Sequence, residues 1–301
     1  MATYEIQHRT HYIYDAPVAV SHHSAHLQPR TDARQQCHRF ALTVRPAAED
    51  VVERQDYFGN TVQYFSIQES HQELIVDSQS EVTVQPMLSL LPDLSPTCRE
   101  VRAAVLDRTT EEALHALQFC YGSPSVPLAE AIEEFAAPFF ADERPFLQAA
   151  LELAHHLHGT FKFDPKATDV TTPVEAFLEL RRGVCQDFAH LMLACLRSQC
   201  LPGAYVSGYI LTQPPPGSPR LVGADASHAW VSIYLPGQGW VDLDPTNDLV
   251  CGEQHVAVAR GRDYTDVSLV RGAVTGGGHH TIAISVTMTP EGERVGTPPR
   301  P

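Results

Sequence analysis

Residues 183–190 have the sequence Gly-Val-Cys-Gln-Asp-Phe-Ala-His, and this short run is the most informative part of the chain. The glycine is expected to end one helix, and apolar residues at helical spacing predict a second helix over 184–197. Cys185 would then lie at a helix N-terminus, where the dipole and the free backbone N–H groups favour a thiolate and can hold an oxyanion. Free cysteines are more often small buried hydrophobes, so this run alone leaves the role of Cys185 open.

Two later runs supply a histidine and two aspartates. Residues 227–234, Ser-His-Ala-Trp-Val-Ser-Ile-Tyr, predict a strand that begins at His228, and residues 239–246, Gly-Trp-Val-Asp-Leu-Asp-Pro-Thr, predict a second strand. Alternation places Asp242 and Asp244 on the same face of that second strand. A short Pro/Gly loop joins the two strands, so we expect them to be antiparallel neighbours. Either carboxylate could orient the imidazole of His228, and the spacing does not choose between them.

Together these runs resemble the bacterial transglutaminase-like cysteine enzymes, from about Phe146 to Asp248. The resemblance implies an α+β, papain-like core in which a helix-borne cysteine packs on an antiparallel sheet. It implies Cys185 as the nucleophile, His228 as the base and Asp244 as the third catalytic residue.

Three further residues are expected to support this site. Asp242 becomes a neighbour that forms a hydrogen bond or faces solvent, while Gln186 and Trp230 are expected to form walls of the site. A tryptophan on a strand is also a common core residue, and that reading of Trp230 stands beside the functional one.

The first ninety residues have the alternation of an antiparallel, β-sandwich-like domain. They resemble the β domain that precedes this core in one bacterial branch, through Tyr-Ile-Tyr-Asp-Ala-Pro at 12–17 and Asp-Tyr-Phe-Gly-Asn at 56–60. The Asp-Ala-Pro at 15–17 is expected to break the first strand. The expected division of the chain is an N-terminal β domain over 1–88, a linker over 89–104, a catalytic core over 105–289 and a flexible tail over 290–301.

Periodicity also predicts the secondary structure of the core. Helices are expected over 99–117, 128–140 and 146–158, and a capping box with proline predicts another helix start at 172–175. Strands are expected over 204–211, 229–235, 240–243 and 281–288. The proline-rich residues 213–218 are expected to form a surface loop, where a lid or specificity loop could lie.

Composition excludes several partners. The 301 residues carry a formal charge of −15, with 36 acidic and 21 basic side chains, which argues against nucleic acid and anionic membranes. No apolar run approaches the roughly 20 residues of a membrane span, and the first ten residues do not resemble a signal peptide. The seven scattered cysteines are therefore expected to be reduced, in a cytoplasmic protein.

No metal or cofactor is expected. The run His155-His156-Leu157-His158 lacks the spacing of a zinc site, and Cys195 and Cys200 have no second Cys or His pair nearby. The chain also has no calcium-loop pattern. His255 could approach the cleft from a flanking segment, although the sequence does not show that it does.

The expected reaction is attack by Cys185 on a peptide or protein amide, with a thioester intermediate. Hydrolysis by water, as in a cysteine peptidase or amidase, is favoured because water is always available. Transfer to an amine, as in a transglutaminase, is the alternative. A further alternative is a peptide-binding module that retains the fold without turnover.

Overall fold

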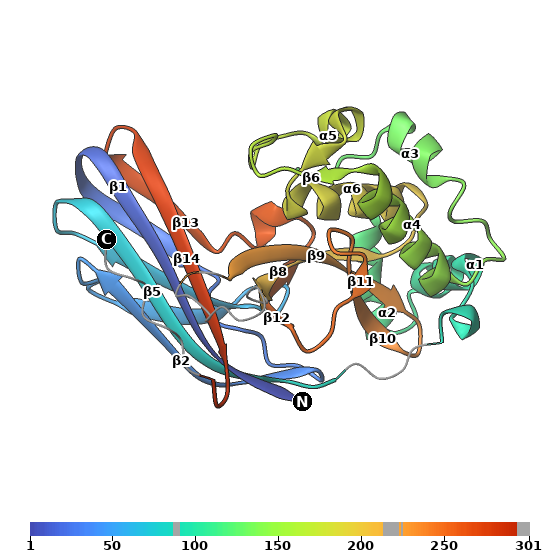
Figure 1. The fold of residues 1–301 in the computed structure, drawn as a ribbon, viewed down its shortest axis with the longest axis horizontal. Helices are drawn as coiled ribbons and strands as arrows, with labels where there is room; N and C mark the ends of the chain where they lie inside the picture. The colour runs from blue at the N-terminus through green and yellow to red at the C-terminus, as the bar shows by residue number, and fades with distance from the viewer. Residues whose placement is uncertain (87–90, 213–222, 224, 294–301) are drawn as a thin grey trace.

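The computed structural model describes residues 1–86, 91–212, 223 and 225–293, and it consists of two sheets with a group of helices (Figure 1). A seven-stranded sheet forms one end of the molecule, and a five-stranded antiparallel sheet lies beneath the helices at the other end. The predicted class, an N-terminal β region followed by an α+β core, is confirmed. The predicted lid at 213–218 and most of the predicted tail, 294–301, lie outside the described residues.

The seven-stranded sheet takes strands from both ends of the chain. Its central strand, β1, pairs with four other strands along its length and is antiparallel to each. The strand order is β2-β5-β1-β4-β3, with β13 and β14 also paired to β1. The strands are β1 (Ala2–Ala25), β2 (Gln35–Arg45), β3 (Val51–Gln55), β4 (Thr61–Ile67), β5 (His71–Val84), β13 (Val270–Gly276) and β14 (His280–Pro290).

The expectation that Asp15-Ala16-Pro17 ends the first strand is wrong. β1 continues to Ala25, and the three residues are absorbed as an irregularity, because Ile13 pairs with Glu73 while Val18 pairs with His71. The later half of β1 has new partners, β4 and β13, which hold it in extended conformation beyond the proline.

The two last strands depart from the expected division of the chain. The expected core extended to residue 289, but β13 and β14 run antiparallel to β1 and belong to the N-terminal sheet. Apolar burial explains the pairing, since Val286 and Met288 of β14 are buried in one cluster with Ile6 of β1 and Val82 of β5. The predicted strand over 281–288 is present, in this different sheet.

The helices of the core agree with the periodicity except at their ends. The expected helix over 99–117 is split into α1 and α2, because Arg108 adopts a left-handed conformation with φ of 55° and Thr110 caps a new helix. The expected linker residues 98–104 lie within α1. The helices are α1 (Cys98–Asp107), α2 (Glu111–Leu117), α3 (Glu130–Ala136), α4 (Phe146–Thr160), α5 (Val174–Leu180) and α6 (Cys185–Ser198).

The predicted capping box at 172–175 is wrong in its detail. The helix does begin at Val174, but the residue at the cap position is Pro173, which has no side-chain hydrogen bond to offer. The Thr172 hydroxyl instead accepts a hydrogen bond from the backbone N–H of Asp169.

The five-stranded sheet carries α6 on one face. Its order is β11-β10-β9-β8-β12, and alternate residues of β9 and β10 pack against buried residues of α6 in one large apolar core. Nearly every residue of α6 is buried, so this helix lies inside the domain. The strands are β8 (Gly203–Ile210), β9 (Ala226–Leu235), β10 (Gly239–Asp244), β11 (Leu249–Val250) and β12 (His255–Gly261).

Two buried amide side chains join the two sheets. Gln35 accepts a hydrogen bond from the N–H of Ala257 at 2.8 Å and donates to its carbonyl at 2.7 Å, and Asn60 makes the same pair of bonds with Arg260 at 2.8 Å each. Ala257 and Arg260 lie on β12, which is the last strand of its sheet, so the two amides extend its ladder where no strand follows. A bulge between Ala257 and Ala259 accounts for the three-residue spacing.

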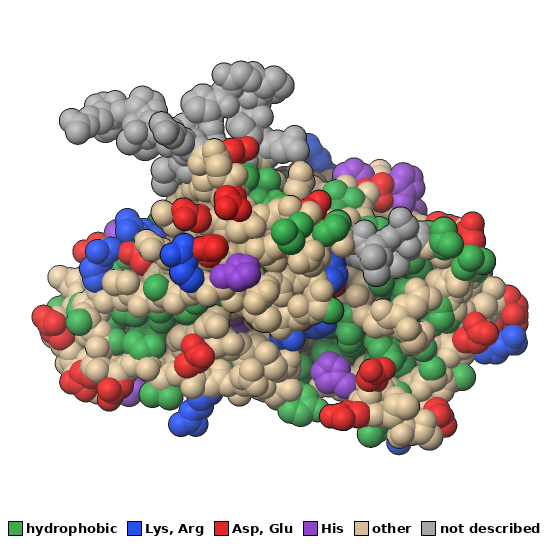
Figure 2. Space-filling model, turned by 90° about the horizontal axis from the view of Figure 1, so that it is seen from below, with side chains coloured by type: hydrophobic (Ala, Val, Ile, Leu, Met, Phe, Trp, Pro, Cys, Tyr) green, Lys and Arg blue, Asp and Glu red, His purple; other side chains and the backbone are tan. Residues whose placement is uncertain are grey.

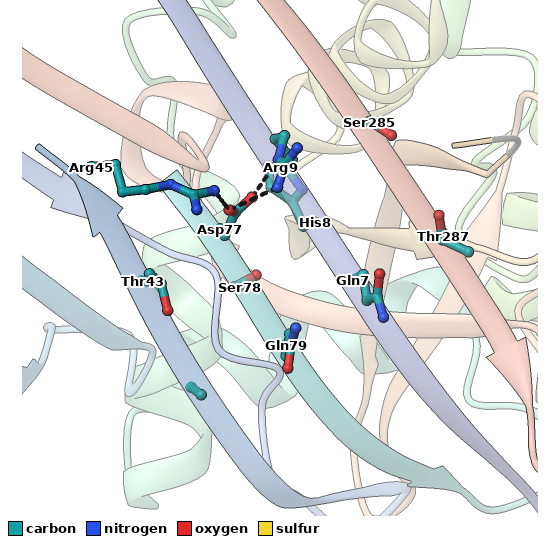
Figure 3. A pocket seen from close by; sticks show the side chains of 11 residues that line it. Gln7, His8, Arg9, Thr43, Arg45, Asp77, Ser78, Gln79, Ser285 and Thr287 are labelled. Carbon is teal, nitrogen blue, oxygen red and sulfur yellow. Dashed lines mark hydrogen bonds and ion pairs between the residues drawn. The ribbon is translucent and has the colours of Figure 1, made fainter. Parts of the chain in front are cut away.

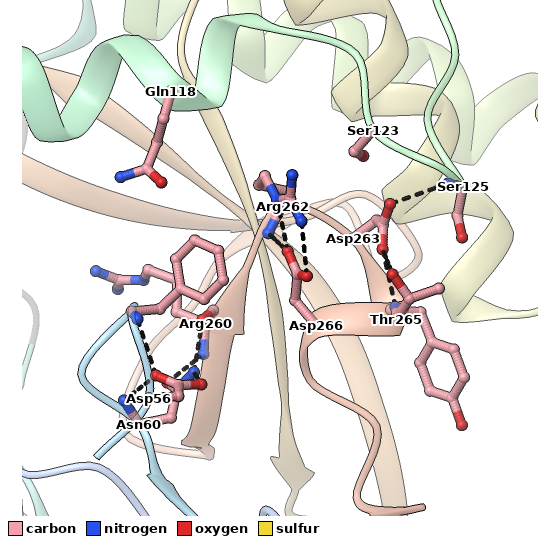
Figure 4. A network of polar contacts seen from close by, with 12 residues as sticks. Asp56, Asn60, Gln118, Ser123, Ser125, Arg260, Arg262, Asp263, Thr265 and Asp266 are labelled. Carbon is pink, nitrogen blue, oxygen red and sulfur yellow. Dashed lines mark hydrogen bonds and ion pairs between the residues drawn. The ribbon is translucent and has the colours of Figure 1, made fainter.

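The turn that presents Asn60 is held by its own hydrogen bonds (Figure 4). Asp56 accepts from the backbone N–H groups of Phe58 and Asn60, both at 2.8 Å, and from the Asn60 side chain at 2.8 Å. Gly59 has φ of +74°, a conformation that side chains other than glycine rarely adopt. The run Asp-Tyr-Phe-Gly-Asn is therefore a rigid turn that clamps one domain to the other.

We expect Asn60→Ala to lower the free energy of unfolding by about 2–4 kcal/mol, because it leaves a buried N–H and a buried carbonyl of Arg260 without this partner. Urea unfolding followed by circular dichroism measures the change. Gln68→Ala removes an exposed amide from the same domain, and we expect a change within about 0.5 kcal/mol. Equal losses in both variants would show that Asn60 does not hold the domains together.

Candidate active site

Cys185 is the first residue of α6, and the approach to it is tightly constrained. The short strand β7 (Arg182–Gly183) leads into the helix, and a Cβ at Gly183 would collide with the Asp187 carboxylate. Asp187 Oδ2 accepts hydrogen bonds from the Val184 N–H at 2.7 Å and from the Thr168 hydroxyl at 2.6 Å. These contacts fix the first turn of α6 and leave the Cys185 side chain half-buried.

His228 and Asp244 lie together on neighbouring strands of the sheet. His228 is near the beginning of β9, Asp244 is the last residue of β10, and His228 Nε2 is 2.7 Å from Asp244 Oδ2. His228 is 8% exposed and Asp244 is fully buried. The Cys185 side chain is close enough to His228 to influence the pKa of the imidazole. Because Asp244 contacts Nε2, the ring nitrogen left for the thiol is Nδ1.

The charges of this trio are coupled. Burial alone would lower the pKa of His228, but its hydrogen bond with Asp244, the adjacent Cys185 side chain and the charges of both raise it to about 10. Burial alone would raise the pKa of Asp244, but hydrogen bonds from His228, His255 and Asn247 hold it well below its usual range. The arrangement therefore favours an ionised Asp244 beside a protonated His228 at neutral pH.

Two residues complete the surroundings of Asp244. His255, at the beginning of β12, places Nε2 3.2 Å from Asp244 Oδ2, and the Asn247 side chain donates to the same oxygen at 2.7 Å. The backbone N–H groups of Thr246 and Asn247 donate to the other oxygen at 3.0 and 3.2 Å. The sequence identified His255 as a possible neighbour of the cleft, whereas Asn247, which follows the Asp-Leu-Asp-Pro-Thr run, was not among the expected site residues.

The other expected site residues lie close by in different roles. Asp242 accepts from the Ser232 hydroxyl at 2.5 Å and from the Trp230 indole N–H at 3.2 Å, so its carboxylate engages these side chains and not His228. Trp230 is 1% exposed, with its ring 6.1 Å from that of His228. Gln186 is buried beside Cys185 and donates to the Val170 carbonyl at 3.2 Å.

The possible metal ligands separate into two groups. His228, Asp244 and His255 offer ligand atoms within 4.8 Å of one another, so they could hold a divalent ion, although the same atoms already serve the hydrogen bonds around Asp244. By contrast, His155 pairs with Asp248 at 2.6 Å and His158 contacts the Thr246 carbonyl at 2.8 Å. The histidine run therefore fastens α4 to the turn that follows Asp244.

The surface outside this site is polar and mixed in charge. Figure 2 shows acidic side chains dispersed across one face of the molecule, in keeping with the net charge of −15. A hollow of about 450 Å³ lies on the seven-stranded sheet, where Arg9 and Arg45 both pair with Asp77 (Figure 3). The residues that line it come from β1, β2, β5 and β14, and Cys185 is not among them.

Similarity to known proteins shows the family to which this chain belongs. Residues 4–83 match the bacterial transglutaminase-like N-terminal region, and residues 133–245 match the transglutaminase-like superfamily. An uncharacterized protein of Mycobacterium tuberculosis is 38% identical over 296 residues, which cover 95% of this chain and 92% of that protein. The chain belongs to the transglutaminase-like superfamily, in the bacterial group that has this N-terminal region.

Two more distant proteins extend the comparison. A protein-glutamine gamma-glutamyltransferase of Pseudomonas aeruginosa is 30% identical over 121 residues, which cover 40% of this chain and only 18% of that protein. The crystal structure of a candidate cysteine protease from Cytophaga hutchinsonii superposes with a TM-score of 0.75 and 17% identity, covering 98% of this chain and 92% of that one. The second similarity concerns the fold alone, and it extends over both domains. Among the described residues, no helix is both long and apolar enough to cross a membrane.

The raised pKa of His228 predicts a pH-dependent contribution to stability. An unfolded histidine has a pKa of about 6.5, so the stabilisation from protonated His228 is complete below that pH and is lost as the pH rises toward 10. We therefore expect the difference in unfolding free energy between wild type and His228→Gln to shrink from pH 6 to pH 10. Urea titrations at several pH values measure it, and a difference that stays constant would contradict the assigned pKa.

The contacts of the two aspartates predict different effects on Cys185. At pH 6, we expect Asp244→Asn to slow alkylation of Cys185 by iodoacetamide about tenfold or more, because the His228 imidazole beside Cys185 loses its buried carboxylate partner. Asp242→Asn changes a buried carboxylate on the same strand and should leave the rate within about twofold. Mass spectrometry of the Cys185 peptide gives the rate, with exposed Cys200 as the internal reference. Similar rates in the two variants would argue against a role for Asp244.

Proposed function

We propose that this protein is a cysteine enzyme that acts on peptide or protein amides through Cys185, His228 and Asp244. The observation that carries the proposal is the 2.7 Å hydrogen bond between His228 and the fully buried Asp244, beside the half-buried Cys185 at the N-terminus of α6. The three residues come from three different elements, and each lies at or near the end of a helix or strand. They correspond to a nucleophile, a base and the group that orients the base.

The reaction begins when the Cys185 thiolate attacks the carbonyl carbon of the amide and forms a tetrahedral intermediate. As the C–N bond breaks, protonated His228 gives its proton to the departing amine, and a thioester remains on Cys185. Asp244 stays ionised throughout, because it compensates the imidazolium without taking its proton. Free backbone N–H groups at the beginning of α6 would stabilise the oxyanion.

In the second half of the reaction, neutral His228 removes a proton from an incoming nucleophile, which attacks the thioester and releases the Cys185 thiolate. Water yields an acid, and the enzyme is then a peptidase or amidase. An amine yields a new amide, and the enzyme is then an acyltransferase. We favour water, because it needs no acceptor site of its own. The Pseudomonas relative named as a gamma-glutamyltransferase supports amine transfer as the second candidate.

We expect wild-type protein, incubated with a pool of peptides that contain glutamine and lysine, to give products that Cys185→Ala does not give. Removing the nucleophile should lower the rate about a thousandfold or more. Mass spectrometry separates three products: a cut backbone gains one water, a deamidated glutamine exchanges ammonia for water, and a crosslink loses ammonia.

Cys200→Ser is the matched control, because it removes an exposed thiol away from the site and should retain full activity. If Cys185→Ala and wild type form the same products at the same rate, the catalytic proposal fails. Retained peptide binding with no product in either protein would favour the non-catalytic binding module.

A further inference from the structure

A cavity of about 600 Å³ lies between the two domains, and it is separate from Cys185. One wall comes from the segment before β2 and the end of β5, and the other comes from β9, β10 and β12. Its volume lies within the range of about 300–1,000 Å³ that is common for small-molecule sites. The chain has two tryptophans, Trp230 and Trp240, and both line this cavity.

Some polar groups of the cavity have hydrogen-bond partners within the protein, and others do not. Its carboxylates are already engaged. Asp242 accepts from Ser232 and Trp230 and pairs with Arg260 at 3.5 Å, and Asp32 accepts from the backbone N–H groups of Arg34 and Gln35. The cavity's two guanidinium groups, Arg34 and Arg260, each have a buried Nε–H with no acceptor among the described residues. The cavity therefore has two Nε–H donors without partners, beside aromatic walls.

Each of these cations is held in place by contacts that leave the Nε–H free. Arg34 donates from its terminal nitrogen to the Cys251 carbonyl at 3.1 Å. The Arg260 guanidinium lies over the Trp240 ring at 5.3 Å, and its terminal nitrogen pairs with Asp242 at 3.5 Å. Since Arg34 belongs to the N-terminal domain and Arg260 to β12, a ligand between them would touch both domains.

A third polar group connects the cavity with the catalytic residues. His255 lines the cavity, is 5% exposed and directs Nε2 to Asp244, while its Nδ1 has no partner among the described residues. Trp230 stands between the two sites, with its ring 5.3 Å from His255 and 6.1 Å from His228. A ligand in the cavity would therefore contact side chains that touch the triad.

We propose that this cavity is a binding site for an organic monocarboxylate with a flat apolar body. The carboxylate would accept hydrogen bonds from Arg34 and Arg260, which can each bind such a group in a planar geometry, and the apolar body would pack against Trp230 and Trp240. The site differs from the amide site at Cys185, and binding to it does not require catalysis.

Intrinsic tryptophan fluorescence tests the proposal directly, because both tryptophans line the cavity. The probes are phenylacetate and the neutral phenylacetamide, titrated into the full chain carrying Cys185→Ala. We expect a saturable change with phenylacetate, and a dissociation constant at least about tenfold weaker for phenylacetamide, which has the same ring without the charge. Isothermal titration calorimetry provides a second measurement of the same constants.

Arg34→Gln and Arg260→Gln should each weaken phenylacetate about tenfold or more, while Arg54→Gln, an exposed arginine of β3, should not. Circular dichroism establishes whether each variant is folded. If Arg260→Gln does not fold, Arg34→Gln alone still tests the proposal. Equal affinity for the acid and the amide, no saturable signal, or equal binding by the Arg34 and Arg54 variants would overturn the proposal. Failure of the amide-cleavage test would leave these results unaffected, so the two proposals are separable.

Discussion

The fully buried carboxylate of Asp244 is the constraint on which the rest of the site depends. An ionised carboxylate away from water is costly unless hydrogen bonds and opposite charge compensate it. Here compensation comes from His228 on β9, from His255 on β12, and from the side chain and backbone of Asn247 in the turn after β10. The donors belong to segments that only the complete sheet brings together. The hydrogen bonds of the Asp244 carboxylate therefore depend on the whole sheet. The same carboxylate orients the His228 imidazole beside Cys185.

The contact from His255 shows why the N-terminal domain matters to this site. In the sheet order, β8 and β9 lie between β12 and β10, yet His255 Nε2 lies 3.2 Å from Asp244 Oδ2. Gly208 of β8 leaves room for the Trp230 ring and the Val256 carbonyl, because a Cβ there would collide with both. β12 is also the strand that Gln35 and Asn60 hold through paired amide bonds. The two domains thus meet on the strand that supplies the second histidine.

Features that depend on a local pattern of residues could be predicted from the sequence. Features that depend on contacts between distant residues could not. Cys185 at a helix start, His228 at a strand start and Asp244 at a strand end all follow from periodicity over a few residues. Periodicity does not predict the contact between Gln35 and Ala257, which are 222 positions apart, or the contact between Asn60 and Arg260, which are 200 positions apart. The same limit explains β1 and β14. A strand can pass through Asp15-Ala16-Pro17 because remote partners hold both of its halves, and the C-terminal residues return to the first sheet because their apolar side chains are buried there.

The two aspartates of β10 show how one strand face can serve two tasks. They are two residues apart on that face, and their spacing alone did not distinguish them, yet different donors reach each one. Asp244 at the strand end meets imidazoles and turn N–H groups, whereas Asp242 meets the Ser232 hydroxyl and the Trp230 indole. Asp242 therefore fixes the ring that stands between His228 and the interdomain cavity. The Trp230 indole accepts no hydrogen bond and is nearly fully buried. A ligand in the cavity could therefore affect His228 through this ring only by displacing it, and the hydrogen bond to Asp242 opposes such a displacement.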